Sequence, residues 1–417
     1  MASVKRIIIG ESGGPTPVID WTVAGALTAA KETGIEMYGA MNGFEGILNA
    51  DAKGNIVDLA DVNPMQFVHN GPGAGLKTTR IKPKEEQYRK ITENLNKNKI
   101  DGVVYIGGND SSDQLLGLTK VNSSLAAVHA IKTIDNDLPV THHCPGYGSA
   151  ALYNATAIKN VTGDFYGYGV RGRDGILTAP VIIYQVMGRK AGWLAQGTAF
   201  ARVNPGGDMV PDRAPHIILS KERLFDKDEF LSALDNVISR IGYAVVVVQE
   251  DLTEKTSGKS ISEVFGTVTR DDHNNIQHGR ADSFSPAVFL AQIATKELKV
   301  KNVKKVKEAA LSPQHVQRSY VTSTSDASEA FMIGYRAVKT IARGDTKKSV
   351  ILKRASRGGF ETDLTDLSNI ARKERSVPAE YIPDIYGPSA DFIKEYVSVI
   401  GGPCALPHYS DINFKEI

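Results

Sequence analysis

Several common features are missing from this chain of 417 residues, and each absence excludes a class of protein. It has only two cysteines, Cys144 and Cys404, which are too few for a disulfide scaffold and lack the CxxC spacing of a zinc site. The apolar run near the N-terminus is only three isoleucines, so it predicts neither a signal peptide nor a membrane span. Lys plus Arg number 49 against 47 for Asp plus Glu, and this balance gives no sign of a nucleic-acid or membrane partner. A cytoplasmic protein is therefore expected.

Two familiar nucleotide-binding sequences are also absent. The stretch "GPGAGLKTTR" contains glycines, a lysine and threonines, but not in the GxxxxGK(S/T) order of a P-loop. No GxGxxG follows the first expected strand, which disfavours a nicotinamide-dependent dehydrogenase. Arg80, at the end of the first of these stretches, nevertheless suits a phosphate because a guanidinium presents a fork of donors.

Strand patterns alternate with helix patterns along the chain. Apolar runs at 4–9, 102–108 and 243–250 predict buried strands, and each has a helical pattern next to it. This alternation predicts parallel sheets covered by helices on both faces. The length exceeds the limit of about 250 to 300 residues for a single core, so two lobes are expected. The basic stretch 300–308 is interpreted as the solvated face of a helix, in preference to a binding patch.

Unusual polar or glycine-rich stretches follow several expected strands, where ligands of open parallel sheets bind. They read "GESGGPTP", "GGNDSS", "KTIDND" and "MGRKAGW". In the first, Gly13 and Gly14 leave backbone N–H groups unhindered before a helix, an arrangement that favours anions. A tight turn that requires glycine explains the same residues equally well.

Asn109 and Asp110 come directly after the strand at 102–108. Their oxygens suit Mg²⁺, which proteins usually hold by one or two side chains together with substrate phosphates. Capping of the following helix is an equally good interpretation. In "KTIDND", a turn explains one aspartate but not Asp135 and Asp137 together with Lys132. A positioned carboxylate and a nearby ammonium favour phosphoryl transfer.

Three further positions have both a structural and a functional interpretation. Arg189 either clamps an anionic substrate or pairs with a surface carboxylate. Glu222 follows an expected strand, where it either accepts sugar hydroxyls or is surface charge. His315 and Arg318 share a face if the chain there is helical, but a lone histidine is more often structural than catalytic.

Taken in order, these stretches resemble the phosphofructokinase family, specifically its pyrophosphate-dependent branch. The motifs that carry the resemblance span essentially the whole chain: "SGGPTPVI", "GLKTTR", "GGNDS", "KTIDNDL", "HCPGYGSA", "MGRKAGW", "HVQR" and "IARKERSVPAEYI". The resemblance implies an α/β fold of two Rossmann-like lobes, each a mostly parallel sheet sandwiched by helices, with the active site between them. It implies a phosphoryl-donor lobe of residues 1–145 plus about 312–360. A sugar-phosphate lobe and C-terminal extension would comprise 146–311 plus about 361–417.

The activity that the resemblance implies is Mg²⁺-dependent, reversible transfer of a phosphoryl group from pyrophosphate to the 1-hydroxyl of fructose 6-phosphate. The products would be fructose 1,6-bisphosphate and phosphate, and the protein would be a homodimer or homotetramer. Asp135 matches the base that deprotonates the acceptor hydroxyl, and ATP-using members have glycine where Asp110 and Lys132 stand. A carboxylate at Asp110 would repel the α-phosphate of ATP, whereas Lys132 would stabilise the phosphate that leaves pyrophosphate.

The resemblance implies the following roles by position. The catalytic residues would be Asp110, Lys132, Asp135 and Asp137. Gly13, Arg80, Asp110 and Lys132 would bind the donor, and Asn109 and Asp110 would hold magnesium. The sugar phosphate would contact Thr133, Ile134, Asp135, Met187, Gly188, Arg189, Glu222, His315 and Arg318.

Some positions depart from the family pattern, namely Asp20, Lys77, His142, Gln185 and Lys221. They gather on the acceptor side and in the glycine loops, so they motivate an alternative acceptor: another sugar phosphate, a sulfonated sugar or a polyol. A non-catalytic subunit is disfavoured, because Arg80, Asp135 and Arg189 are all retained.

Overall fold

The protein is described by a computed structural model in which two compact units are distinguished. The described residues are 4–69, 73–166, 170–171, 177–266, 284–298, 303–311, 314–318 and 320–402. Unit 1 comprises Met1–Ser149 and Arg318–Arg375, and unit 2 comprises Ala150–Gln317 and Ser376–Ile417. Like the expected lobes, each unit is built from two stretches of chain, although the second stretch of unit 1 extends to Arg375 and not only to about residue 360.

Unit 1 contains a seven-stranded sheet with the order β12-β11-β5-β4-β1-β2-β3. Its strands are β1 (Arg6–Glu11), β2 (Glu36–Ala40), β3 (Ile56–Asp58), β4 (Gly102–Gly107), β5 (Ala126–Ile131), β11 (Lys348–Arg354) and β12 (Phe360–Asp366). The inner strands pair in parallel, and only the edge strands β3 and β12 are antiparallel to their neighbours. The carboxyl ends of β1, β4 and β5 therefore meet at one edge of the sheet.

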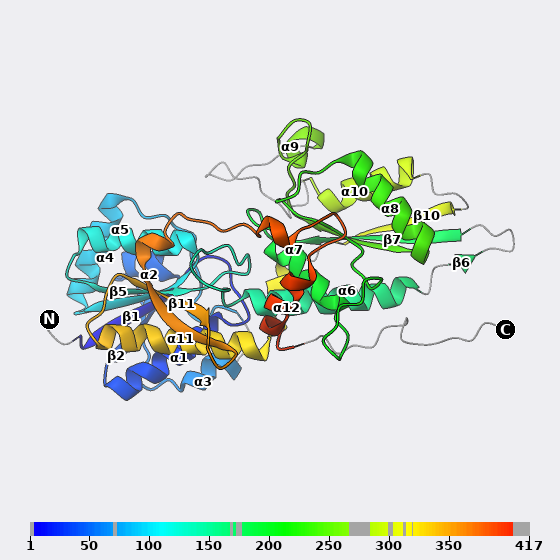
Figure 1. Ribbon diagram of the computed structural model, residues 1–417. Helices are drawn as coiled ribbons and strands as arrows, with labels where there is room; N and C mark the ends of the chain where they lie inside the picture. The colour runs from blue at the N-terminus through cyan, green and yellow to red at the C-terminus, as the bar shows by residue number, and fades with distance from the viewer. Residues whose placement is uncertain are drawn as a thin grey trace. The chain divides into compact units, whose positions relative to one another are not determined.

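Helices cover both faces of this sheet (Figure 1). They are α1 (Ile19–Thr33), α2 (Gly43–Leu48), α3 (Pro64–His69), α4 (Glu85–Lys97), α5 (Asn109–Val121) and α11 (Thr324–Ala342), with the short 3₁₀ helix η3 (Leu367–Asn369). Ile7 and Ile9 belong to the core with α1 and α11, whereas Ile8 belongs to the core with α4 and α5. Successive side chains of a strand point to opposite faces, so a strand covered on both sides must be apolar at every position.

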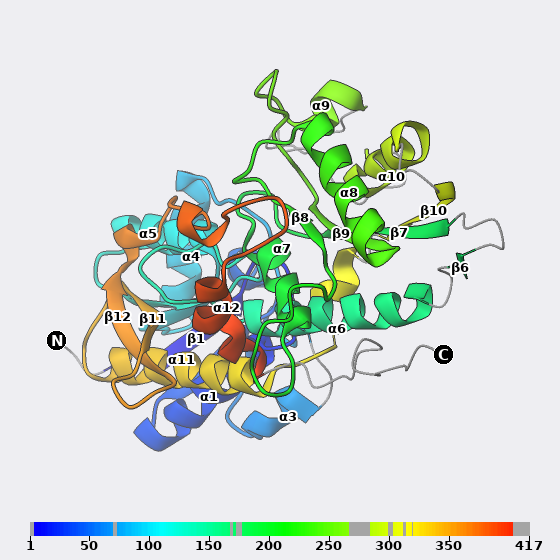
Figure 2. The ribbon, with the colours of Figure 1, turned by 45° about the vertical axis from the view of Figure 1, so that its right-hand side comes forward.

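The two longest helices of unit 1, α1 and α11, lie side by side (Figure 1 and Figure 2). Glycines allow their close approach: a Cβ on Gly25 would overlap the backbone of Phe331, and one on Gly334 would overlap the carbonyl oxygen of Thr22. This contact packs the chain's late helix against its first one.

Unit 2 has a second, mainly parallel sheet with the order β10-β7-β9-β8, and β6 pairs with β7 in antiparallel fashion. The strands are β6 (Val170–Arg171), β7 (Leu177–Val186), β8 (Ile217–Leu219), β9 (Ala244–Gln249) and β10 (Val303–Leu311). The helices are α7 (Trp193–Gly197), α8 (Lys227–Ile241), α9 (Ile261–Phe265), α10 (Pro286–Glu297) and α12 (Ala390–Tyr396). Short 3₁₀ helices complete it: η1 (Thr198–Arg202), η2 (Gln314–Arg318), η4 (Ala379–Tyr381) and η5 (Val397–Ile400), while α6 (Tyr147–Tyr166) begins in unit 1.

The fold class expected from the sequence is confirmed, but the type of one element was predicted wrongly. The stretch 300–308 was interpreted as a helix face, whereas the chain from Val303 to Leu311 is strand β10, paired with β7. Its valines recur at every third residue, 300, 303 and 306, a spacing nearer to the period of a helix than to that of a strand, and the lysines between them suggested a solvated face.

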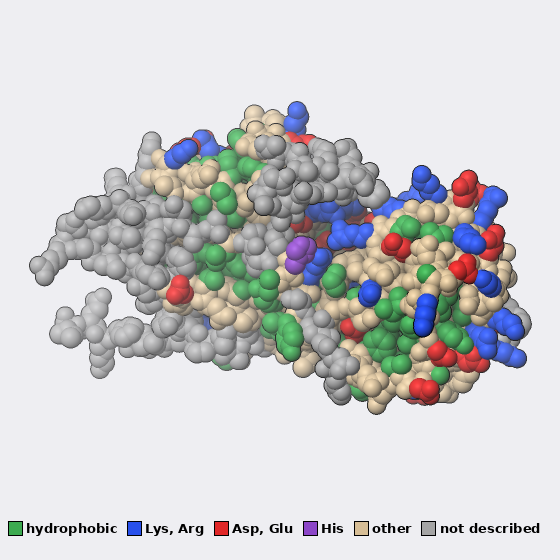
Figure 3. Space-filling model, turned by 180° about the vertical axis from the view of Figure 1, so that it is seen from behind, with side chains coloured by type: hydrophobic (Ala, Val, Ile, Leu, Met, Phe, Trp, Pro, Cys, Tyr) green, Lys and Arg blue, Asp and Glu red, His purple; other side chains and the backbone are tan. Residues whose placement is uncertain are grey.

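The surface charge of the described residues is mixed in sign, as the balanced composition predicts. On the face drawn in Figure 3, Lys and Arg side chains are interspersed with Asp and Glu, and neither sign dominates. Across the described ranges, no helix combines the length and the apolar character needed to cross a membrane.

Candidate active site

The glycine loop after β1 is held from two sides. Gly13 donates its N–H to the carbonyl of Thr79 at 3.0 Å, and its own carbonyl accepts from the hydroxyl of Thr78 at 2.5 Å. Gly13 has a φ of 79°, which favours glycine, and a Cβ on Gly14 would overlap the guanidinium of Arg318. The glycines therefore make a tight turn and leave room for a cation against the backbone, while the anion-site interpretation stays a prediction.

Lys132 points into this loop from the end of β5. Its side chain is 3% exposed, and Nζ donates to the carbonyls of Ser12 at 2.9 Å and Gly14 at 2.7 Å. Burial, together with the positive charges of Arg318 and Arg80, lowers the pKa of Lys132 to about 8. Glu11 and Asp135 act in the opposite direction. The pKa of this one ammonium group is thus set by charged residues that are far apart in the sequence.

A pair of buried carboxyl groups, Glu11 and Asp20, lies behind the loop. Burial and the nearby Asp20 raise the pKa of Glu11 well above its usual value, which favours its neutral form. Burial also raises the pKa of Asp20, to about 6, and its Oδ1 accepts a hydrogen bond from Gly75 N at 2.8 Å. Sequence reasoning missed Glu11, although a carboxylate that ends a run of buried isoleucines was an available signal.

The predicted base lies in a turn that begins directly after β5. The N–H of Asp135 donates to the hydroxyl of Thr133 at 3.1 Å, and Thr133 N donates to the carbonyl of Pro145 at 3.1 Å. Ile134 is 6% exposed and Asp137 is 7% exposed, while Asp135 is only partly buried. The turn therefore leaves Asp135 accessible and encloses its neighbours.

Asn109 and Asp110 occupy the first turn of α5. The N-cap of α5 is Gly108, and Asn109 Oδ1 accepts from the N–H of Asp110 at 2.8 Å, so the side chain of Asn109 does serve the start of the helix. Asn109 Nδ2 donates to the carbonyl of Lys373 and to Oε1 of Glu374, both at 3.2 Å. The exposed carboxylate of Asp110 pairs with Lys82 at 3.2 Å.

The residues near α5 fit a magnesium ion that is shared with substrate phosphates, but not one held by the protein alone. Within the described ranges, no group of three or more His, Cys, Asp or Glu side chains is placed to hold a metal. A single exposed carboxylate, that of Asp110, with an amide beside it matches the sparse protein ligation typical of Mg²⁺ bound to phosphates.

The predicted sugar-phosphate residues of unit 2 follow β7 and β8. Met187 N donates to Gln317 Oε1 and Gly188 N donates to Glu250 Oε1, each at 3.1 Å. Oε1 of Glu222 accepts from Gly192 N at 2.8 Å and from Val377 N at 3.0 Å. Its Oε2 is buried without a hydrogen-bond partner among the described residues. Glu222 is thus largely occupied by backbone groups, and the expected surface-charge alternative does not fit it.

The positions that depart from the family pattern in unit 2 have structural partners. Gln185 is 2% exposed, and its Oε1 accepts from Ser285 Oγ at 3.0 Å at the start of α10. Lys221 Nζ donates to the carbonyl of Arg189 at 3.2 Å and lies 3.5 Å from Asp251. Lys221 therefore touches the loop of a predicted substrate residue, whereas Gln185 serves a helix end.

The unit 1 departures are also explained locally. Lys77 is exposed with a φ of 57°, the region that favours the glycine usual at this position. Asp20 holds Gly75, as described above. His142 Nδ1 lies 2.9 Å from Nδ1 of His143, and the His142 ring lies 4.6 Å from that of Phe360.

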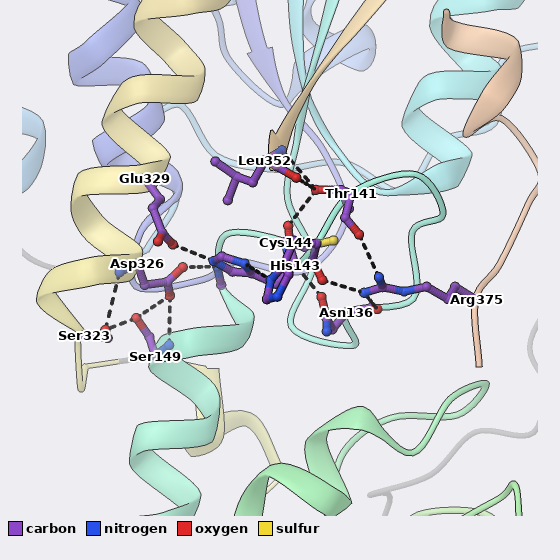
Figure 4. A network of polar contacts seen from close by, with 12 residues as sticks. Asn136, Thr141, His143, Cys144, Ser149, Ser323, Asp326, Glu329, Leu352 and Arg375 are labelled. Carbon is purple, nitrogen blue, oxygen red and sulfur yellow. Dashed lines mark hydrogen bonds and ion pairs between the residues drawn. The ribbon is translucent and has the colours of Figure 1, made fainter. Parts of the chain in front are cut away.

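A buried polar network continues from His143 into α11 and α6 (Figure 4). His143 Nε2 lies 2.6 Å from Glu329 Oε2, and burial raises the pKa of Glu329 to about 8 while lowering that of His143 to about 4. Both shifts favour the neutral forms, in which the carboxyl of Glu329 donates to the imidazole. Asp326 accepts from Gly146 N, and from both N and Oγ of Ser149, near the start of α6.

The predicted residues are divided between the two units. Unit 1 contains Gly13, Arg80, Asn109, Asp110, Lys132, Thr133, Ile134, Asp135, Asp137 and Arg318. Unit 2 contains Met187, Gly188, Arg189, Glu222 and the exposed His315. His315 and Arg318 were expected to share a helical face; both belong to η2, and the boundary between the units falls just before Arg318.

Comparison with known proteins identifies the family. The family model "Phosphofructokinase" matches residues 6–341. A pyrophosphate–fructose 6-phosphate 1-phosphotransferase of Rhodospirillum rubrum is 32% identical over 90% of this chain and 89% of its own. A sulfofructose kinase of Alkalicoccus urumqiensis is 25% identical over 86% of each chain. The crystal structure of a pyrophosphate-dependent phosphofructokinase from Nitrosospira multiformis matches with a TM-score of 0.77 and 26% identity, over 98% of this chain and 95% of its own.

Proposed function

The chain belongs to the phosphofructokinase family and is a phosphotransferase, and from this premise we propose its reaction in detail. It transfers a phosphoryl group, with Mg²⁺, from pyrophosphate to the 1-hydroxyl of fructose 6-phosphate. The products are fructose 1,6-bisphosphate and phosphate, and the transfer runs in both directions. We further propose that the enzyme acts in the cytoplasm as a homodimer or homotetramer, an assembly that light scattering on the purified protein measures.

One observation carries this proposal: Lys132 and Arg318 lie against one glycine loop, and Arg80 is near enough for its charge to act on Lys132. Burial and the charges of Arg80 and Arg318 depress the pKa of Lys132, so the three cations are close enough to repel one another. Such repulsion is costly unless an anion of high charge binds there. Pyrophosphate, a small anion of high charge, fits that requirement.

Asp135 is the proposed base of the transfer. It removes the proton from the 1-hydroxyl as the hydroxyl oxygen forms a bond to phosphorus, while the bond from phosphorus to the bridging oxygen of pyrophosphate breaks. The charge that develops on the leaving phosphate is stabilised by Lys132, which keeps one N–H beyond the two used on Ser12 and Gly14. Asp137, which is buried, is proposed to support the turn and not to touch the substrate.

Magnesium would be held by Asp110 and Asn109 together with phosphate oxygens. When bound, the ion supplies neutralisation of the phosphate charge. The carboxylate of Asp110 also stands where it would repel the α-phosphate of ATP, and this repulsion is the proposed basis for the choice of pyrophosphate.

The donor assignment is tested with the purified enzyme and a panel of donors. Fructose 6-phosphate is offered with pyrophosphate or with ATP, each with Mg²⁺ and with EDTA. Turnover with pyrophosphate and Mg²⁺ alone is expected. Turnover with ATP in place of pyrophosphate would overturn the donor assignment, and unchanged turnover in EDTA would overturn the role of magnesium.

Removing the base is a separate test. Asp135→Asn keeps the shape of the side chain but cannot take the proton, so kcat should fall about a hundredfold or more. Steady-state kinetics measure this loss, with Asp345→Asn as a control on an exposed turn. A near-normal rate in folded Asp135→Asn would exclude the proposed mechanism.

A second candidate keeps the donor and changes the acceptor to another sugar phosphate, a sulfonated sugar or a polyol. It is favoured by the contact of Lys221 with the loop of Arg189, and by the similarity to a sulfofructose kinase. A panel of acceptors with pyrophosphate separates the candidates. A kcat/KM for fructose 6-phosphate far below that for another acceptor would favour the second one.

A further inference from the structure

The residues Arg372–Arg375 run past both of the loops that carry the predicted chemistry in unit 1. Lys373 and Glu374 accept hydrogen bonds from Asn109, and Arg372 pairs with Asp113 of α5 at 2.8 Å. Arg375 N donates to the carbonyl of Asp137 at 2.7 Å. This segment, which we term the C-terminal strap, therefore joins the loop after β4 to the turn after β5.

The guanidinium of Arg375 binds the turn at both of its ends (Figure 4). Nη1 donates to the carbonyl of Thr141 at 2.6 Å. Nη2 donates to the carbonyls of Asn136 and His142, each at 3.1 Å. Only a planar fork of donors reaches several fixed carbonyls in this way, and a lysine ammonium does not reproduce the pattern.

The turn that Arg375 binds has an unfavourable backbone. Asn136 has a φ of 52° and Val140 a φ of 58°, and the latter is rare for a β-branched residue. Asn136 is fully buried, and its Oδ1 accepts from Cys144 N at 3.0 Å, while its Nδ2 is buried without a hydrogen-bond partner among the described residues. Such a conformation persists only where the surroundings determine it, and the strap supplies those contacts from far along the chain.

We infer that Arg375 is a positioning residue for the predicted base Asp135, acting through the backbone of residues 136–142. The inference rests on the proposed function, because it assigns Arg375 to the same site. Asp135 is fixed on one side by the bond from its N–H to Thr133 Oγ1, and on the other by the carbonyl of Asn136, which Arg375 binds. Without Arg375, the carboxylate loses one of these two constraints.

A displaced base affects the chemical step more than donor binding. A misplacement of about 1 Å costs about a hundredfold in rate for a group that reacts directly. The cations proposed to bind pyrophosphate, Lys132, Arg80 and Arg318, lie on other segments of the chain, and the ammonium of Lys132 donates to the glycine loop. The inference therefore predicts a loss in kcat with little change in the KM for pyrophosphate.

The test compares Arg375→Gln and Arg375→Lys with the matched control Arg372→Gln, which removes an exposed arginine from the same strap. Arg375→Gln should lower kcat about a hundredfold, with the KM for pyrophosphate within about threefold of the original. Arg375→Lys should be intermediate, and Arg372→Gln should leave kcat within about twofold. Equal rates in Arg375→Gln and Arg372→Gln would overturn the inference.

Amide hydrogen exchange without substrate provides the second readout. In the Arg375 variants, exchange should rise about tenfold or more over residues 137–142 and stay unchanged in β4 and β5. A rise of the same size in the strands would mean a general loss of stability and would overturn the inference. If Arg375→Gln does not fold, Arg375→Lys carries both readouts. If the unaltered enzyme does not use pyrophosphate, the proposed function fails, while the exchange result still decides whether Arg375 orders the turn.

Discussion

Lys132 combines a structural and an electrostatic role at a single residue. Two of its N–H groups hold the glycine loop, and its burial among other cations lowers its pKa to about 8. A lysine of ordinary pKa would stay charged throughout the physiological range, whereas this one begins to lose its charge just above it. That Lys132 faces pyrophosphate stays a prediction, and the loss of its charge at high pH provides a way to test it.

The KM for pyrophosphate should therefore depend on pH. The charged form of Lys132 binds the donor, so the KM should be steady near pH 7 and rise up to about tenfold per pH unit above about 8. Lys132→Met should bind pyrophosphate weakly with no such rise, and it controls for the titration of the donor itself. Parallel pH profiles for the two proteins would contradict this role.

Glu329, in the network of Figure 4, should make the stability of the protein depend on pH. Its pKa is raised from 4.5 to about 8 by burial, so between these values the folded state binds more protons than the unfolded state. Stability should then fall as pH rises, by about 2 kcal/mol between pH 6.5 and pH 8. His143, with its pKa lowered to about 4, has the opposite effect only below about pH 6.5.

Glu329→Gln should remove this fall, because an amide still donates to His143 Nε2 but does not titrate. Urea unfolding midpoints at pH 6.5 and pH 8 measure the difference. The midpoint of the variant should change less than that of the original protein. An equal change in both would mean that another group causes the dependence.

At the scale of elements, the packing of α1 on α11 depends on having no side chain at two positions. A Cβ on Gly334 would overlap the backbone of Thr22, and backbone cannot move aside as a flexible side chain does. Overpacking costs about 3 kcal/mol at its upper range, and alanine recovers about 1 kcal/mol through its helix propensity. The overlap therefore dominates.

Gly334→Ala should destabilise the protein by about 2 kcal/mol. Urea unfolding followed by circular dichroism measures the loss, with Ser328→Ala on the exposed side of the same helix as the control. The control should stay within about 0.5 kcal/mol of the original. Equal free energies of unfolding for the two variants would show that α1 and α11 can move apart to admit a methyl group without loss of stability.

Elements also show where sequence patterns succeed and fail. The buried runs at β1, β4 and β9 were predictable, because strands covered on both faces are apolar at every position. Strand β10 was not, because its lysines suggested a solvated helix and its pairing with β7 is a long-range contact. The same limit applies to the strap, whose partners lie more than two hundred residues away.

At the scale of the whole molecule, the proposed donor residues and most of the proposed acceptor residues belong to different compact units. Each unit has its own sheet and its own core. The two substrates should therefore protect different segments of the protein from amide hydrogen exchange. This separation is a consequence of the proposed function that can be measured without turnover.

Amide hydrogen exchange should report that separation. Pyrophosphate with Mg²⁺ should protect the glycine loop and the turn after β5 in unit 1, and fructose 6-phosphate alone should protect the loops after β7 and β8 in unit 2. A ligand at about 100 times its Kd stabilises its site by about 2.7 kcal/mol, which is ample protection to detect. Protection by pyrophosphate confined to unit 2 would contradict the assignment.

The sequence by itself determined the family, through the order of its motifs. It also determined the fold class and the residue types at the ends of the strands, because strand periodicity and local loop chemistry are short-range properties. Asp135, Lys132 and Arg80 could be singled out on that basis, and their roles stay predictions. Only the tertiary structure decided which groups share one environment: Lys132 with Arg318, Glu11 with Asp20, and Arg375 with the turn of Asp135. Burial and charge act through space, so shifted pKa values and long-range hydrogen bonds arise only when folding brings distant residues together.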